Sequence, residues 1–177
     1  MVGLERGKVE LEEHKEEWKR EYEREVSRLK DLIGDKILGF EHIGSTAIDR
    51  TKAKPIIDMI AIIEDLEDSE MIVSVLEKHG YEHRTNGDLK DRIFLAKGSE
   101  NNRTHYLSLT EKESKFYRRT TIFRDYLKTH PEAAKKYSKL KQKLAGKHQD
   151  NRDKYTEEKT EFIENIIEKA QKELPDN

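Results

Sequence analysis

The residue whose position points most directly to chemistry is Asp58, the charged residue inside the apolar run from Ile56 to Ile63. A carboxylate in a buried strand costs several kcal/mol unless it is paired or bound to a cation. Mg²⁺ takes one or two carboxylates together with phosphate oxygens of a substrate. Asp58 is therefore predicted to be a metal ligand and catalytic carboxylate. The alternative is a buried salt bridge with a lysine or arginine.

A turn rich in small hydroxyl residues, Gly44-Ser45-Thr46, precedes this run. Glycine lets the backbone approach a ligand closely, and free N–H groups at a helix start hold phosphate with help from a hydroxyl. The turn is therefore predicted to bind phosphate. An ordinary helix N-cap has the same composition and is the alternative explanation.

Basic residues on or beside the predicted strands complete the candidate site. Lys54, Arg92, Lys97 and Arg103 would clamp a polyphosphate if their strand faces converge on one pocket, where His105 would act as a proton shuttle. The alternatives are a solvated strand edge protected by charge and, for His105, a structural hydrogen bond.

These residues need strands to position them. The run from Ile56 to Ile63 is short, continuous and β-branched, which is typical of a strand buried on both faces. Further strands are predicted near residues 36–42, 81–84, 92–97 and 103–109, with a hairpin loop at 98–102. Side chains alternate along a strand, so Arg103 and His105 are expected on one face.

Helices are predicted at residues 14–33 and 67–79, and throughout the chain from residue 112 onward. Apolar residues recur there at steps of three and four, and Pro131 fits the first turn of a helix. The charges of the last helical segments, Lys159 among them, are expected to form an exposed face.

The composition limits the classes of function. Basic and acidic residues number 35 and 37, so the net charge of -2 argues against bulk nucleic-acid binding. The absence of cysteine excludes disulfides and thiolate metal sites. No apolar run reaches the ~20 residues of a membrane span, and the first residues lack a secretory apolar core, so a cytoplasmic protein is expected.

Several segments, in order along nearly the whole chain, resemble the GrpB family, a group assigned to the nucleotidyltransferase superfamily. The specific ones are EHIGSTA at 41–47 and KPIID at 54–58. Supporting segments are FRDYL at 123–127 followed by His130-Pro131, RTH at 103–105 and YTEEK at 155–159.

The resemblance implies an α/β (α+β) fold, with a nucleotidyltransferase-like mixed sheet, flanking helices and a C-terminal helical bundle. Residues 1–177 would form one domain, with the α/β core at 1–110 and the helical part at 111–177. In the superfamily a Gly-Ser pair holds nucleotide phosphates and acids on the next strand bind two Mg²⁺ ions. Gly44 and Ser45 match the pair, and Asp58 matches the first acid.

The chain departs from the superfamily pattern at Ile60, where a second acid on the face of Asp58 would stand. Two-metal phosphoryl chemistry needs carboxylates for both cations, so one Mg²⁺ is expected here. One hypothesis is an enzyme that transfers a nucleotidyl or phosphoryl group, with Glu41 or Asp91 as a further acid. The other is a non-catalytic module that binds a nucleotide, a coenzyme-like molecule or another phosphorylated ligand.

Overall fold

The run that contains Asp58 forms strand β2 (Ile57–Ile63), in which every residue except Asp58 is buried. The computed structural model describes residues 1–173, and its sheet has the strand order β1-β2-β5-β4-β3. The predicted buried interior strand is therefore confirmed, while the middle position belongs to β5. The other strands are β1 (Gly39–Ile43), β3 (Tyr81–His83), β4 (Ile93–Lys97) and β5 (His105–Glu111).

The sheet is mixed, as predicted. Strands β2 and β5 pair in parallel, and the other neighbours pair antiparallel. The register sets Asp58 beside Tyr106 on β5 and beside Ile43 on β1, so these side chains share one face. His105 pairs with Ile57 and so belongs to the opposite face.

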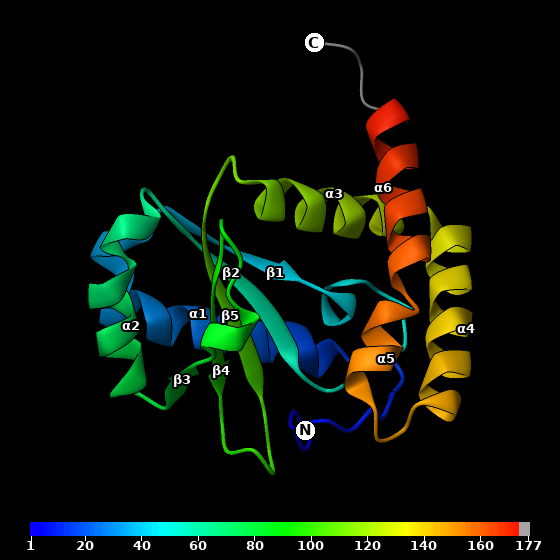
Figure 1. The fold of residues 1–177 in the computed structure, drawn as a ribbon, viewed down its shortest axis with the longest axis horizontal. Helices are drawn as coiled ribbons and strands as arrows, with labels where there is room; N and C mark the ends of the chain where they lie inside the picture. Colours follow the sequence, from blue (N-terminus) through cyan, green and yellow to red (C-terminus); the bar gives the residue numbers. More distant parts are fainter. Residues whose placement is uncertain (174–177) are drawn as a thin grey trace.

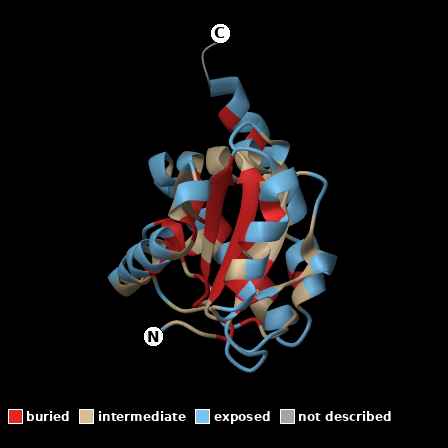
Figure 2. Ribbon diagram, turned by 90° about the vertical axis from the view of Figure 1, so that its left-hand side faces the viewer, coloured by how far each residue is buried: buried red, intermediate tan, exposed pale blue. Residues whose placement is uncertain are grey.

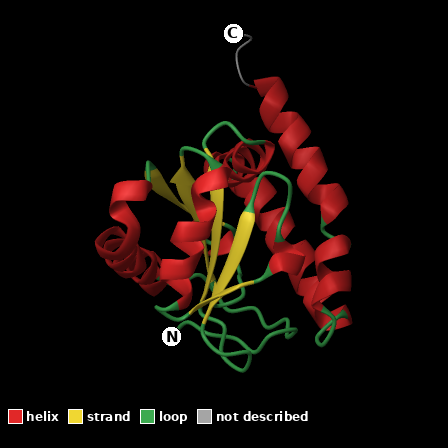
Figure 3. Ribbon diagram, turned by 60° about the vertical axis from the view of Figure 1, so that its left-hand side comes forward, coloured by secondary structure: helices red, strands yellow, loops and turns green. Residues whose placement is uncertain are grey.

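Helices cover both faces of the sheet (Figure 1; Figure 3). Helices α1 and α2 pack on one face, where Trp18, Leu29 and Leu76 join Met59 and Leu107 in the largest buried cluster. The remaining helices lie on the other side of the sheet. The helices are α1 (Glu16–Ile33), α2 (Ser69–Glu77), α3 (Lys115–Thr129), α4 (Pro131–Lys147), α5 (Arg152–Glu157) and α6 (Thr160–Glu173).

The C-terminal helices have an apolar core of their own, in which Leu127, Tyr137 and Ile166 join α3, α4 and α6. Helix α3 also packs on the sheet, where Phe116 covers Ile60. Figure 2 shows the resulting pattern, with strands buried between helices whose outer surfaces are exposed. From residue 112 to residue 173 the structure contains no strand, as predicted.

None of the helices in residues 1–173 is both long enough and apolar enough to span a bilayer.

Candidate functional site

Asp58 lies beneath the backbone of Gly44, which has a φ of 69°. A Cβ atom at position 44 would lie 2.6 Å from Oδ2 of Asp58. Both the left-handed conformation and the close approach therefore require glycine. The Gly-Ser pair and the carboxylate meet in space, as the resemblance implied.

Gly44→Ala should destabilise the protein by about 1–3 kcal/mol, because alanine must adopt a left-handed conformation and displace the carboxylate. Urea denaturation measures this change. Gly34→Ala is the matched control, since Gly34 has a φ of -53° and its nearest neighbour atom would lie 3.8 Å from the new Cβ. Equal effects of the two substitutions would contradict the close packing of Gly44 on Asp58.

The Asp58 carboxylate forms no hydrogen bond or ion pair with any residue from 1 to 173; its interactions there are burial and longer-range charge. Burial raises the pKa of Asp58, and nearby cations oppose the rise. We call these cations the basic cluster: Lys54, Arg152, Lys159 and Arg92. The described residues therefore form no direct salt bridge with Asp58, which was the alternative explanation for a carboxylate in this strand.

The two lysines of the basic cluster are held in an environment that disfavours their charge. Burial, followed by the charge of Arg152, lowers the pKa of Lys54 to about 7. Burial likewise lowers the pKa of Lys159 to about 8. The ring of Tyr155 supports both cations, with its centroid 5.8 Å from Nζ of Lys54 and 4.3 Å from Nζ of Lys159. A nearby anion would stabilise the charged form of both lysines.

Ser45 contacts a lysine that comes from helix α4. Nζ of Lys141 donates a hydrogen bond to Oγ of Ser45 at 2.8 Å and another to the carbonyl oxygen of Lys52. The same ammonium position lies 4.5 Å from the centroid of the Tyr137 ring. Ser45 itself begins a short 3₁₀ turn, Ser45–Ala47, where the sequence predicted the start of a helix. Its hydroxyl forms no cap in this turn.

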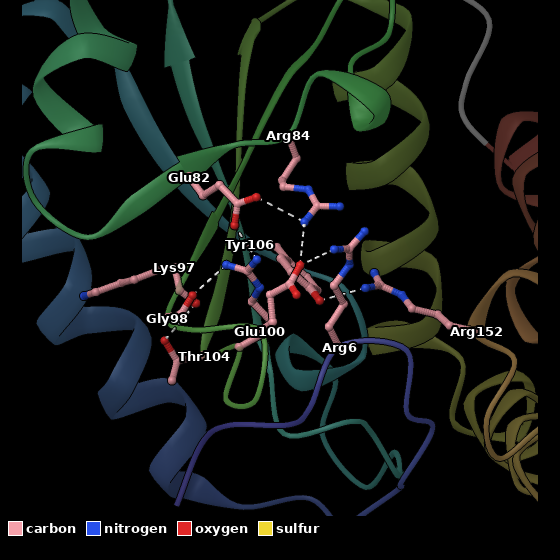
Figure 4. A network of polar contacts seen from close by, with 10 residues as sticks. Arg6, Glu82, Arg84, Lys97, Gly98, Glu100, Thr104, Tyr106 and Arg152 are labelled. Atoms are coloured by element: carbon pink, nitrogen blue, oxygen red, sulfur yellow. Dashed lines mark hydrogen bonds and ion pairs between the residues drawn. The ribbon is translucent and has the colours of Figure 1, made fainter.

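Asp58 lines a cavity of about 750 Å³ whose wall carries five arginines: Arg6, Arg84, Arg92, Arg103 and Arg152. Figure 4 shows the contacts of Arg6, Arg84 and Arg152 with their partners, of which Glu82 and Glu100 lie outside the cavity wall. Some wall arginines are neutralised, since Arg103 pairs with Glu82, and Arg84 with both Glu82 and Glu100.

Arg152 and Arg92, the arginines that act on Asp58, have different partners. Arg152 donates to the Tyr106 hydroxyl at 2.7 Å. Arg92 donates to the carbonyl oxygen of Gly87, and its guanidinium lies over the rings of Phe94 and Phe116. Neither forms an ion pair with a carboxylate of the described residues, so positive charge remains available in this cavity.

Of the residues predicted for one cavity, Asp58, Arg92 and Arg103 line it, whereas Gly44, Ser45 and Lys54 do not. The prediction for His105 and Lys97 is wrong, because both lie on the sheet face that packs against α1, where Lys97 pairs with Glu25. His105 is buried there and its Nδ1 lies 3.0 Å from the Thr104 hydroxyl, while burial lowers its pKa to about 4. The structural role considered for His105 fits this position, and a proton shuttle at Asp58 does not.

Thr46 and Arg103, two further residues predicted to bind phosphate, differ from the expected geometry. Thr46 is buried, and its hydroxyl lies 3.0 Å from Nε2 of His42 in a second cavity of about 840 Å³. Arg103 precedes β5, so strand alternation does not group it with His105. Its side chain enters the Asp58 cavity and donates to the carbonyl oxygen of Gly98 at 2.6 Å.

Sequence reasoning missed the contribution of the C-terminal helices. Lys141, Arg152 and Lys159 reach the neighbourhood of Asp58 and Ser45 from α4, α5 and the α5–α6 junction. Lys159 was expected on an exposed face, but it is partly buried against Tyr155. Its place in the YTEEK segment that supported the resemblance was the available signal.

The residues present fit one carboxylate ligand of a cation and do not fit a two-metal site. Ile60, at the position of a second acid, is fully buried against α3. Glu41 pairs with Arg124 at 2.6 Å, and Asp91 accepts a hydrogen bond from the backbone of Phe116 at 2.7 Å. No group of three or more potential ligands from His, Cys, Asp and Glu gathers anywhere in residues 1–173.

Comparison with known proteins gives consistent results. The family described as GrpB protein matches residues 8–169. The UPF0157 protein YqkA of Bacillus subtilis is 35% identical over 93% of this chain, which spans 48% of that relative's length. The glutamate-rich protein GrpB of Alkalihalophilus pseudofirmus is 35% identical over 94% of this chain and 98% of its own. The crystal structure of the conserved protein GrpB from Enterococcus faecalis superposes with a TM-score of 0.85 at 35% identity, covering 92% of this chain and 98% of that one.

Proposed function

The chain belongs to the GrpB family, and from that premise we propose that its Asp58 cavity binds a nucleotide or another phosphate-bearing ligand. The observation that carries the proposal is the excess of positive charge at Asp58. The basic cluster brings two arginines and two lysines to one unpaired carboxylate, and burial disfavours the charge of both lysines. A bound phosphate group supplies the missing negative charge and restores full protonation of the lysines.

Mg²⁺ enters this proposal together with the ligand. A lone cation gains little at a site where positive side chains already outnumber the carboxylate. A cation held by the phosphate oxygens needs few protein ligands, and Asp58 is then its carboxylate ligand. Gly44 allows the backbone to approach the phosphate, and the Ser45 hydroxyl supplies a further polar contact.

Binding of such a ligand can have two outcomes, and one observation bears on each. Ile60 argues against two-metal transfer and favours a module that binds the ligand without turning it over. The unpaired Asp58 and the surrounding cations suit transfer of a nucleotidyl or phosphoryl group, because they stabilise negative charge that develops on a leaving phosphate.

Pyrophosphate and ATP, each with and without Mg²⁺, should raise the melting temperature of the wild type. At a ligand concentration 100 times the Kd, the expected rise is roughly 5–10 °C. The double variant Lys54→Met/Lys159→Met should lose most of this response, because it removes two cations that face Asp58. Differential scanning fluorimetry makes the measurement.

The control for this experiment is Lys154→Met, which removes an exposed lysine of helix α5. It should respond to pyrophosphate as the wild type does. Absence of any response in the wild type, or an equal loss in both variants, would rule out phosphate binding at the basic cluster.

A further inference from the structure

Ser45 and Lys141 form a hydroxyl–amine pair whose two members are unequally exposed. Oγ of Ser45 and Nζ of Lys141 lie 2.8 Å apart. Lys141 is 2% exposed, whereas Ser45 is partly exposed. Ser45 is therefore the more exposed member of the pair, and Lys141 is the buried one.

Lys141 is unusual because its buried amine has no carboxylate partner among the described residues. Its hydrogen bonds go to Ser45 and to a backbone carbonyl, and the titratable groups facing it are Lys54, Lys159 and Tyr137. Burial, then the charges of Lys159 and Lys54, lower the pKa of Lys141 to about 6. The lowered pKa favours the neutral amine, whose nitrogen has a free lone pair.

We propose that Ser45 is a nucleophile and Lys141 its general base, acting on the phosphorus atom of a phosphate ester or anhydride. This inference rests on the proposed function, which supplies the phosphate ester or anhydride as the electrophile. A serine beside an unprotonated lysine is an established arrangement for covalent catalysis. The hydroxyl is a weak nucleophile while it keeps its proton, and the lysine accepts that proton.

The fold brings the pair to the ligand. Ser45 follows Gly44, whose backbone packs directly on the Asp58 carboxylate at the cavity. Lys54 and Lys159 lie close enough to influence both Lys141 and Asp58. Gly44 thus connects Ser45 directly to the carboxylate that lines the cavity.

The reaction balances with water as the second substrate. Nζ of Lys141 accepts the Ser45 hydroxyl proton while Oγ forms a bond to phosphorus. The bond from phosphorus to the leaving oxygen breaks, that oxygen keeps the electron pair, and Lys141 returns the proton to it. Water then attacks the phosphorylated Ser45 and gives a proton to Lys141. The bond between Oγ and phosphorus breaks, and Oγ takes the proton back. The sum is hydrolysis of the ester or anhydride.

Diisopropyl fluorophosphate tests the pair directly, because it is an uncharged phosphorus electrophile that does not depend on phosphate binding. Intact-mass and peptide mass spectrometry should find one adduct on Ser45 of the wild type. Its rate should rise with pH through the range near neutrality in which Lys141 loses its proton. Ser45→Ala should remove the adduct, and Ser74→Ala, which changes an exposed serine of α2, should leave the rate unchanged.

Variants of Lys141 separate catalysis from structure. Lys141→Arg keeps hydrogen-bond donors at this position but stays protonated and cannot act as a base at neutral pH, so labelling should slow by at least about 10²-fold. Lys141→Met should slow it equally, with folding checked by circular dichroism. Labelling of Lys141→Arg at the wild-type rate, or no Ser45 adduct on the folded wild type between pH 6 and 9, would overturn the proposal.

The two proposals fail separately. Labelling of Ser45 without any stabilisation by pyrophosphate would retain the serine–lysine pair and reject the phosphate ligand. Stabilisation by pyrophosphate with no Ser45 adduct would reject the pair and retain the binding site.

Discussion

Asp58→Asn is expected to leave the ligand-free protein at least as stable as the wild type, and to remove the extra stabilisation that Mg²⁺ gives in the presence of pyrophosphate. The substitution keeps the shape of the side chain and discards a charge that burial disfavours, as the raised pKa of Asp58 indicates. It also removes the carboxylate proposed to bind the cation. Pyrophosphate alone should bind the variant as tightly as the wild type, or more tightly, because the basic cluster then has no negative neighbour.

Thermal melts of both proteins, with pyrophosphate and Mg²⁺ added singly and together, make the measurement. Asp31→Asn, which changes an exposed residue of α1 on the other side of the sheet, is the matched control and should behave as the wild type. If Asp58 were half of a buried structural ion pair, its loss would cost about 3–5 kcal/mol without ligand. Such a drop, with the Mg²⁺ effect unchanged, would show that Asp58 serves the fold and not a ligand.

Stability of the ligand-free protein should increase as the pH rises from about 6 to about 10. The folded-state pKa values of Lys54 and Lys159, about 7 and about 8, lie below the value near 10.4 of an unfolded lysine. In this window the unfolded chain binds more protons than the folded one, so the free energy of unfolding rises with pH. Asp58 acts in the opposite sense at lower pH, because its raised pKa makes stability fall as it loses its proton.

Urea denaturation at several pH values measures the slope. The gain across the window should be on the order of 2 kcal/mol or more, since each unit of pKa shift corresponds to about 1.4 kcal/mol. Lys54→Met/Lys159→Met should reduce the slope and leave the part that comes from Lys141, whose pKa is also lowered. Saturating pyrophosphate should reduce it in the wild type by keeping Lys54 and Lys159 protonated. Lys139→Met/Lys143→Met, which changes two exposed lysines of α4, should keep it. A slope that is unchanged by loss of Lys54 and Lys159 would place its origin elsewhere.

Local sequence patterns predicted the elements of the fold because each element has a local cause. The run around Met59 is too apolar and too β-branched for a surface segment, and Pro131 starts α4 because it lacks the N–H that a first helical turn leaves unused. Asp58 was recognisable for the same reason, since a charge inside such a run needs an explanation.

Faces of the sheet were harder to predict, because they depend on register. A shift of one residue moves every side chain of a strand to the opposite face, and no local pattern fixes how β5 aligns with β2. The observed register sets His105 beside Ile57 and so turns it away from Asp58. The position of Lys97 does not depend on register. Lys97 follows Ala96 on the same strand, so the two side chains face opposite sides of the sheet, and Ala96 lines the cavity.

The lysines of the C-terminal helices could not be predicted from local pattern. Lys141 and Lys159 stand in segments rich in charge, where a solvated lysine is the ordinary case. Their burial arises when α4 and the α5–α6 junction pack beside the turn at Ser45 and around Tyr155, a tertiary arrangement that local periodicity does not encode.

Helices from the end of the chain supply cations to a carboxylate near its first third, and this order matters while the protein is being made. Synthesis proceeds from the N-terminus, so Gly44, Ser45 and Asp58 leave the ribosome long before Lys141, Arg152 and Lys159. A nascent chain that has formed the sheet still lacks two of the four cations of the basic cluster, Arg152 and Lys159. The proposed ligand is therefore expected to bind only after translation has passed Lys159.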